Sequence, residues 1–222
     1  MNRFVKHITT IIFCTIFFTN LSAQFNPVIA YTPATQVIYI GVENPIAITL
    51  GEYNLSDINI KVSEGSIRSA SEDGKYLWKI CSSKSDSVFL SIYCRDTLLN
   101  KLRFYLKELR EPIPMVGNGP NCFISEQFWG QVGVRIQNAS ELYDDLGVKN
   151  HLITYKIEFS DSNKVIYKRI INKSAYFTKN SIREFKKLNP HYYIRIYNIK
   201  AQVGCEPIPR ILSKEIYFRL SN

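Results

Sequence analysis

Apolar residues recur at every second position along most of this chain, which is the period of a β-strand with one buried face. The clearest case is His151–Phe159, in which apolar residues from Ile153 onward alternate with polar ones. Only Ser181–Leu188 has a helical pattern, and it is long enough for about two turns at most. The alternation therefore predicts an all-β fold.

Short predicted strands, bounded by turn-forming residues, are spaced as in a β-sandwich. They are Gln36–Val42, Pro45–Leu50, Asn59–Val62, Tyr76–Cys81, Val88–Tyr93 and Leu98–Leu106, followed by Gln131–Gln137, His151–Phe159, Lys164–Ile171, Tyr192–Val203 and Ile211–Leu220. We expect a turn at Glu43–Asn44, and we expect Tyr192–Val203, which is apolar on both faces, to be a central strand.

The segment Glu111–Pro120 holds three prolines and two glycines, and we expect it to interrupt the strand ladder. A domain boundary is placed here. The predicted architecture is all-β, with two tandem immunoglobulin-like β-sandwich domains at residues 24–110 and 111–222, after a leader at residues 1–23.

The leader has the pattern of a secretory signal peptide. Basic residues precede the mostly apolar run Ile8–Phe18, which is too short to span a bilayer comfortably. Cleavage is predicted after Ala23, and an uncleaved anchor is the alternative. We therefore expect an exported protein that is periplasmic, outer-membrane-associated or secreted.

Removal of the leader would leave four cysteines, Cys81, Cys94, Cys122 and Cys205. An even number of cysteines in an exported chain indicates disulfides. We predict one bridge within each half, Cys81–Cys94 and Cys122–Cys205. The alternative is free, buried thiols that pack as small apolar side chains.

No motif for nucleotide binding, zinc binding or nucleophilic hydrolysis occurs in the sequence. The chain has three histidines, too few to favour a histidine metal centre. Asp144 and Asp145 are adjacent, so their side chains should diverge, and they are interpreted as part of a solvated loop, with a calcium-type site as the alternative. We predict no catalytic residue, no cofactor and no metal.

Positive charge is distributed unevenly. Residues 24–110 hold 10 basic and 9 acidic residues, whereas residues 111–222 hold 16 and 10. Basic and aromatic residues interleave in the second region, and the candidate partner-binding residues are Lys168, Arg169, Arg183, Lys186, Lys187, Tyr192 and Tyr193. Such a surface suits an anionic glycan or an acidic protein, and export argues against nucleic acid. The alternative is a solvated sheet surface whose lysines protect edge strands.

A series of segments along the chain resembles one known family. In order, they are VIYIGVENPIAITL (Val37–Leu50), GKY (Gly74–Tyr76), RFYLKELREPIPMVGNG (Arg103–Gly119), QFWGQVGVRIQN (Gln127–Asn138), TYKIEFS (Thr154–Ser160) and IYNIKAQVGCEPIPRILSKEIYFRL (Ile196–Leu220). They are similar to the C-terminal half of the GldM/PorM family, the periplasmic part of the gliding-motility and type IX secretion motor.

This resemblance implies tandem β-sandwich domains, often dimeric, that bind or transmit rather than catalyse. A leader stands where the family carries a transmembrane helix, so we expect a free-standing exported relative and not the motor subunit. The implied partners are envelope proteins of the secretion or gliding apparatus, with a homodimer as a further option. A secreted glycan-binding adhesin and a hydrolase are the alternative functions.

Overall fold

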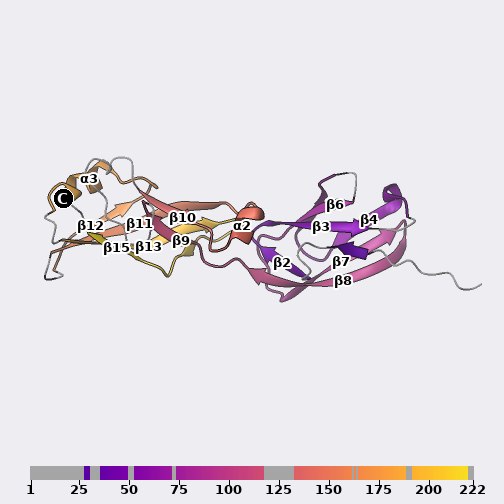
Figure 1. Cartoon of the computed structure of the whole chain (residues 1–222). Coiled ribbons are helices and arrows are strands. Elements are labelled where there is room, and N and C mark those ends of the chain that lie inside the picture. The colour runs from indigo at the N-terminus through magenta and orange to yellow at the C-terminus, as the bar shows by residue number, and fades with distance from the viewer. Residues whose placement is uncertain are drawn as a thin grey trace, which may run out of the picture.

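The computed structural model describes residues 28–30, 36–49, 53–71, 74–117, 133–161, 163, 165–188 and 192–219. Two lobes lie end to end (Figure 1): residues 28–109 form the N-terminal half and residues 113–219 the C-terminal half. Nearly all regular structure is strand, so the predicted all-β fold is confirmed. The predicted leader, residues 1–23, lies outside the described residues.

Two four-stranded sheets make up the N-terminal half. One has the order β1 (Val28–Ala30), β3 (Glu43–Thr49), β6 (Lys75–Lys79), β5 (Ser66–Ser69). The other has the order β2 (Val37–Ile40), β8 (Thr97–Glu108), β7 (Ser87–Cys94), β4 (Ile58–Val62), with β2 parallel to β8. When β1 and β2 are counted as two parts of the first strand, this is the immunoglobulin order of ABED facing GFC.

The two sheets of the N-terminal half close on one apolar core. Trp78 of β6 is fully buried and lies edge-on to Phe104 of β8, with 5.5 Å between ring centroids. The indole N–H donates to the Glu64 carbonyl at 2.9 Å, which satisfies the one polar atom of the side chain. Each sheet therefore buries its inner face against the other.

Asn44 is a fully buried polar residue that fixes the start of β3. Its side-chain oxygen accepts the Tyr39 N–H at 2.8 Å, and its amide nitrogen donates to the carbonyls of Tyr39 at 2.9 Å and Val42 at 3.1 Å. These bonds hold a bend at Gly41–Val42. The turn predicted at Glu43–Asn44 is therefore wrong, because both residues belong to β3.

The C-terminal half is built on a five-stranded antiparallel sheet. The order is β12 (Ile166–Asn172), β11 (Asn150–Ser160), β13 (Tyr193–Val203), and both β14 (Arg210–Ile211) and β15 (Ile216–Arg219) pair with the remaining edge of β13. The central place predicted for Tyr192–Val203 is confirmed. The single strand predicted at Ile211–Leu220 is instead two short strands.

Alternation along β11 places Tyr155, Ile157 and Phe159 in the core, as predicted, whereas Ile153 is only half-buried. The ribbon of β9 (Ile113–Val116) and β10 (Val134–Gln137) supplies buried residues to the same core. So does α3 (Lys179–Phe185), whose Phe185 lies 5.5 Å from Phe159 between ring centroids. These elements cover one face of the sheet and leave the other face to solvent.

Ile113–Val116 forms strand β9, although the prolines of Glu111–Pro120 were expected to interrupt the strands. Pro114 pairs with Ile136 of β10. A two-stranded ribbon tolerates proline because each of its strands has an open edge.

In the described residues, two short helices lie outside the one predicted helical segment. They are η2 (Leu55–Asp57) and α2 (Glu141–Asp145). Helix α2 is held by Tyr143, which is buried, and Asp144 accepts from the Asn138 side chain at 2.7 Å. Asp144 and Asp145 therefore end a helix rather than sit in a loop. The predicted helix, Ser181–Leu188, is shifted and begins at Lys179.

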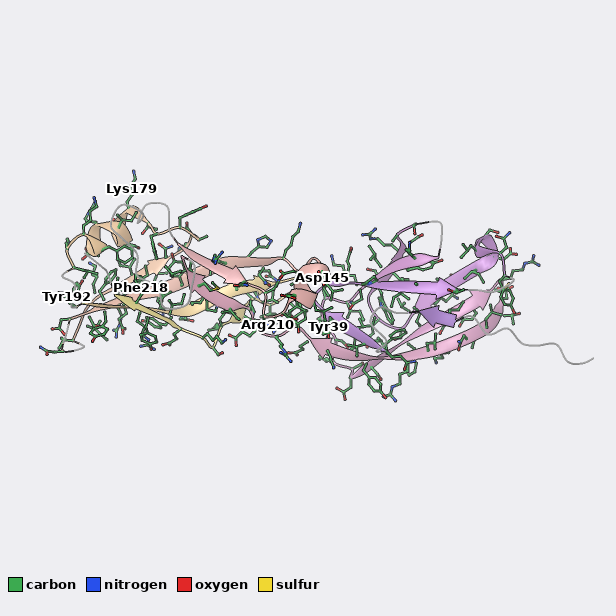
Figure 2. All side chains as sticks on the ribbon, viewed as in Figure 1. Tyr39, Asp145, Lys179, Tyr192, Arg210 and Phe218 are labelled. Atoms are coloured by element: carbon green, nitrogen blue, oxygen red, sulfur yellow. A yellow bond between two sulfur atoms is a disulfide. The ribbon has the colours of Figure 1, made fainter. Side chains whose placement is uncertain are left out.

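The two halves meet at a junction with its own small apolar cluster, formed by Val42, Leu109, Tyr143, Val148 and Val203. Gly204 is required there, because a Cβ added to it would lie 2.0 Å from the Gly41 carbonyl oxygen. Arg210 donates from Nη1 to the Leu109 carbonyl at 2.8 Å. Figure 2 shows Arg210 beside Tyr39 between the two lobes.

A disulfide crosses this junction and joins Cys81 to Cys205, with 5.2 Å between Cα atoms. The predicted pairs Cys81–Cys94 and Cys122–Cys205 are therefore wrong. The prediction assumed bridges within each half, but the chain reverses at the junction after both β6 and β13. Cys94 is a free, half-buried thiol, and Cys122 lies outside the described residues. Such a bridge is typical of chains that fold in an oxidising compartment, which supports export.

Candidate functional site

Three of the predicted partner-binding residues line one groove between β12 and α3. The groove has a volume of about 580 Å³, and its walls are formed by Lys168, Arg169, Ile170, Ile171, Asn180, Arg183 and Glu184. Lys168 and Arg183 are exposed, and among the described residues no ion pair joins either of them to a carboxylate. The structure thus brings together cations from two separate elements.

Strand β12 forms the edge of the five-stranded sheet, and in the described residues it pairs only with β11. Large apolar side chains are exposed along and just before it, with Val165 at 60% exposure and Ile171 at 62%. An edge strand has main-chain N–H and C=O groups that no neighbouring strand uses. The groove therefore runs beside a strand that is open to pairing.

Helix α3 is fixed at both ends by local contacts. The Thr178 hydroxyl accepts the Ser181 N–H at 3.3 Å as an N-cap, and Phe185 is anchored in the core. Lys179 projects from this helix into solvent (Figure 2). The helix therefore holds its basic side chains on its outer side.

Lys186 and Lys187 follow α3 directly. Lys186 is its exposed C-cap residue, and Lys187 donates to the Glu184 carboxylate at 3.0 Å. Glu184 is the one acidic residue of the groove wall. Because its carboxylate is paired with Lys187, it does not neutralise Lys168 or Arg183.

Tyr192 and Tyr193 occupy different environments. Tyr192, at the far end of the C-terminal lobe (Figure 2), lies 5.6 Å from the Tyr167 ring in an edge-on arrangement. Burial, together with the charge of Glu184 and with Tyr192, raises the pKa of Tyr167 to about 12, so Tyr167 stays neutral. Tyr193 precedes buried Ile194 in β13, so it lies on the solvent-facing side of the sheet.

Arg169 also belongs to that solvent-facing side, where it is held by a row of charges that we call the paired ladder: Arg169, Glu158, Arg195 and Glu215. Arg169 donates from Nε to Glu158 at 2.9 Å, and Arg195 Nη1 lies 3.6 Å from the other Glu158 oxygen. Arg195 makes two hydrogen bonds to Glu215, both of 2.7 Å. The seven predicted residues therefore do not form one patch.

Three groups of the paired ladder have shifted pKa values, and the main cause of each shift is a hydrogen bond to another member of the ladder. Hydrogen bonding to Glu215 raises the pKa of Arg195, and hydrogen bonding to Glu158 raises the pKa of Arg169. Hydrogen bonds from Arg195 lower the pKa of Glu215, against the opposing effect of burial. Arg169, Arg195 and Glu215 are therefore more stable in their charged forms beside their partners.

Sequence reasoning missed a second set of cations, on the outer face of the N-terminal sheet that contains β8. We call it the cation–aromatic face and define it by Lys61, Phe89, Tyr93, Lys101, Arg103 and Tyr105. Lys61 lies over Tyr93 at 5.0 Å, Lys101 over Phe89 at 4.8 Å, and Arg103 over Tyr105 at 5.1 Å, measured to ring centroids. The signal was the alternation in Lys101–Lys107, which the near-zero net charge of this half concealed.

Nothing in the described part of the chain forms a metal site, since no three histidine, cysteine or carboxylate side chains gather there. Among the same residues, no helix has both the length and the apolar composition needed to cross a bilayer.

No family model and no curated protein matches the chain. Among solved structures, the Yersinia pseudotuberculosis adhesin InvE is similar over 90% of this chain and 60% of its own length, at 8% identity and a TM-score of 0.31. The cadherin-like domains 1 to 4 of zebrafish RET are similar over 83% of this chain and 46% of their own, at 8% identity and a TM-score of 0.18. The chain spans less than two thirds of the length of either neighbour. The functional conclusion therefore rests on the geometry of its own surfaces.

Proposed function

We propose that this chain is an exported, non-enzymatic binding module whose C-terminal half docks an extended acidic segment of a partner protein. The observation that carries the proposal is the groove between β12 and α3. Its cations Lys168 and Arg183 have no acidic partner in the described structure, and it lies beside an open edge strand. An added strand would gain main-chain hydrogen bonds from β12 and charge complementarity from the groove.

A protein segment suits this site better than a second copy of the chain. Exposed apolar residues such as Ile171 offer contact area that a purely electrostatic partner would leave unused. Two copies paired edge to edge along β12 would bring Lys168 and its like-charged neighbours together, which is unfavourable. The complementary partner therefore carries carboxylates.

The resemblance to the GldM/PorM family supplies the class of partner, namely an envelope protein of the gliding or type IX secretion apparatus. Its location would be the periplasm or the outer membrane. Export is supported by the disulfide Cys81–Cys205 and by the leader pattern at residues 1–23. A module of this kind would bridge components rather than drive the motor.

The test is affinity capture of the mature protein from its own cell envelope. The groove variant K168E/R183E/K186E reverses three charges but leaves Arg169 in place, because a carboxylate there would face Glu158. The matched control K84E/R135E/K214E reverses three exposed cations elsewhere.

We expect the wild type and the control to retain the same secretion or gliding component, and the groove variant to lose at least about 90% of it. Equal recovery with the groove variant would overturn the proposal. The basic residues of β12 would then be interpreted as protection of an edge strand against aggregation.

A further inference from the structure

The outer face of the sheet β2-β8-β7-β4 carries several positive charges. Side chains there alternate with buried residues of the same strands, such as Leu90 of β7 and Phe104 of β8. Residues that share a face of one strand are about 6.8 Å apart, and neighbouring strands are about 4.8 Å apart. Lys101 and Arg103 are successive members of the row along β8, and Lys61 lies two strands away.

These charges are not neutralised within the described structure. The four strands contain one acidic residue, Glu108, which is the last residue of β8. Among the described residues, no ion pair involves Lys61, Lys101 or Arg103. Each of the three instead lies over an aromatic ring, which attracts and positions a cation without cancelling its charge.

The geometry points to a second binding site: we propose that the cation–aromatic face binds a linear acidic polysaccharide laid along β8. Its carboxylate or sulfate groups would pair with Lys61, Lys101 and Arg103. The exposed rings, Tyr105 at 52% exposure and Phe89 at 36%, would contact the apolar faces of sugar rings. Because the aromatic rings already position the cations, little side-chain freedom is lost on binding.

The composition of the face favours a hydrated polyanion over an acidic protein. Two of the three stacked cations are lysines, a residue type that is depleted at protein interfaces, and Lys107 extends the same row. Hydroxyl side chains at Ser87 and Ser91 alternate with the rings of β7 along the same face and provide hydrogen bonds for sugar hydroxyls. The choice of polysaccharide over nucleic acid rests on the export that is part of the proposed function.

The experiment uses the whole mature protein and measures affinity for heparin, polygalacturonic acid, neutral dextran and a single-stranded DNA 20-mer in 50 to 200 mM salt. The face variant K61A/K101A/R103A removes the three cations and keeps the rings. The control K84A/R135A/K214A removes the same charge from other exposed sites. Melting curves of both variants establish that the fold is retained.

We expect the wild type to bind at least one of the two acidic polysaccharides more tightly than the DNA, and not to bind dextran. The face variant should lose at least about tenfold in affinity, and its salt dependence should be shallower by about two to three counterions. The control should stay within about threefold of wild type.

Equal losses in both variants would show that net charge alone attracts the polymer, and would overturn the proposal. Tighter binding of DNA than of either polysaccharide would overturn it as well, and would assign the face to nucleic acid. Capture of the partner protein depends on the groove and is measured with different substitutions, so failure of one proposal is distinguishable from failure of the other.

Discussion

The solvent-facing sides of two sheets, one in each half, both place cations over aromatic rings, as Arg195 lies over Tyr197 and Lys101 over Phe89, but they differ in whether a carboxylate is paired with the cation. On the paired ladder of the C-terminal half, Arg169 faces Glu158 on the neighbouring strand, and Arg195 is paired with Glu215, the residue just before β15. On the cation–aromatic face of the N-terminal half, each cation lies over a ring and no acid competes for it. The ladder holds two of the arginines of the C-terminal half in ion pairs, so the number of basic residues in a half does not show where its unpaired cations lie.

The largest expected effect concerns the bridge that joins the two halves. The double variant C81S/C205S should unfold with a free energy lower by about 3 kcal/mol, because the bridge closes a loop with a sequence separation of 124 residues. Urea denaturation measures this difference. Cys94→Ser is the control, since that thiol is free, and it should cost much less. Equal stability of the double variant and the wild type would show that the junction holds without the bridge.

Breaking the paired ladder at its centre should be the next most costly change. Glu158 is only 7% exposed and lies between Arg169 and Arg195, so Glu158→Ala leaves two arginines without their shared partner. We expect a loss of about 2 kcal/mol in unfolding free energy, reduced from the value for a buried pair because both arginines are partly exposed. Glu158→Gln, which keeps a hydrogen-bond acceptor, should cost less. If neither substitution changed the unfolding free energy, the paired ladder would not contribute to the stability of the fold.

Acid should weaken the ladder and leave the cation–aromatic face unchanged. The pKa of Glu215 is lowered by hydrogen bonds from Arg195, so the unfolded chain takes up this proton first. The stabilisation is full above the ordinary glutamate value of 4.5 and is lost as pH falls through the lower folded value. Relative to Glu215→Gln, the wild type should be more stable by about 1 kcal/mol at pH 7, and this difference should vanish in acid. A difference that is independent of pH would contradict this account.

The smallest effect is expected on the cation–aromatic face itself. Lys101→Ala and Arg103→Ala should each change the unfolding free energy by about 0.5 kcal/mol, the value of an exposed cation–ring contact. Losses near that of Glu158→Ala would indicate that these cations support the fold and are not free for a ligand. Parallel urea titrations of the three variants give the comparison directly.

The sequence predicted what depends on local pattern. Alternation in His151–Phe159 identified the buried side of β11, and the apolar character of Tyr192–Val203 identified the central strand. Helix α2 was not predicted, because its one turn is stabilised by the burial of Tyr143 at the junction and the sequence there has no helical periodicity. The Cys81–Cys205 bridge was not predicted, because it depends on how the two halves meet.

The candidate site was only partly predictable for the same reason. Lys168 and Arg183 could be chosen from composition, and the structure places them in one groove. Whether Arg169 is free depends on the register that sets it opposite Glu158, and a strand register is not visible in a count of charges. The stacking of Lys101 on Phe89 likewise requires the pairing of β7 with β8.

Hydrogen exchange of the arginine side chains, followed by NMR at neutral pH, tests the contrast between the two faces most directly. The Nε–H groups of Arg169 and Arg195 donate to Glu158 and Glu215, so they should exchange slowly. The Nε–H of Arg103, which has a ring and no carboxylate as its partner, should exchange near the rate of a solvent-exposed arginine. Equal exchange rates for all three arginines would contradict the division into paired and available charge.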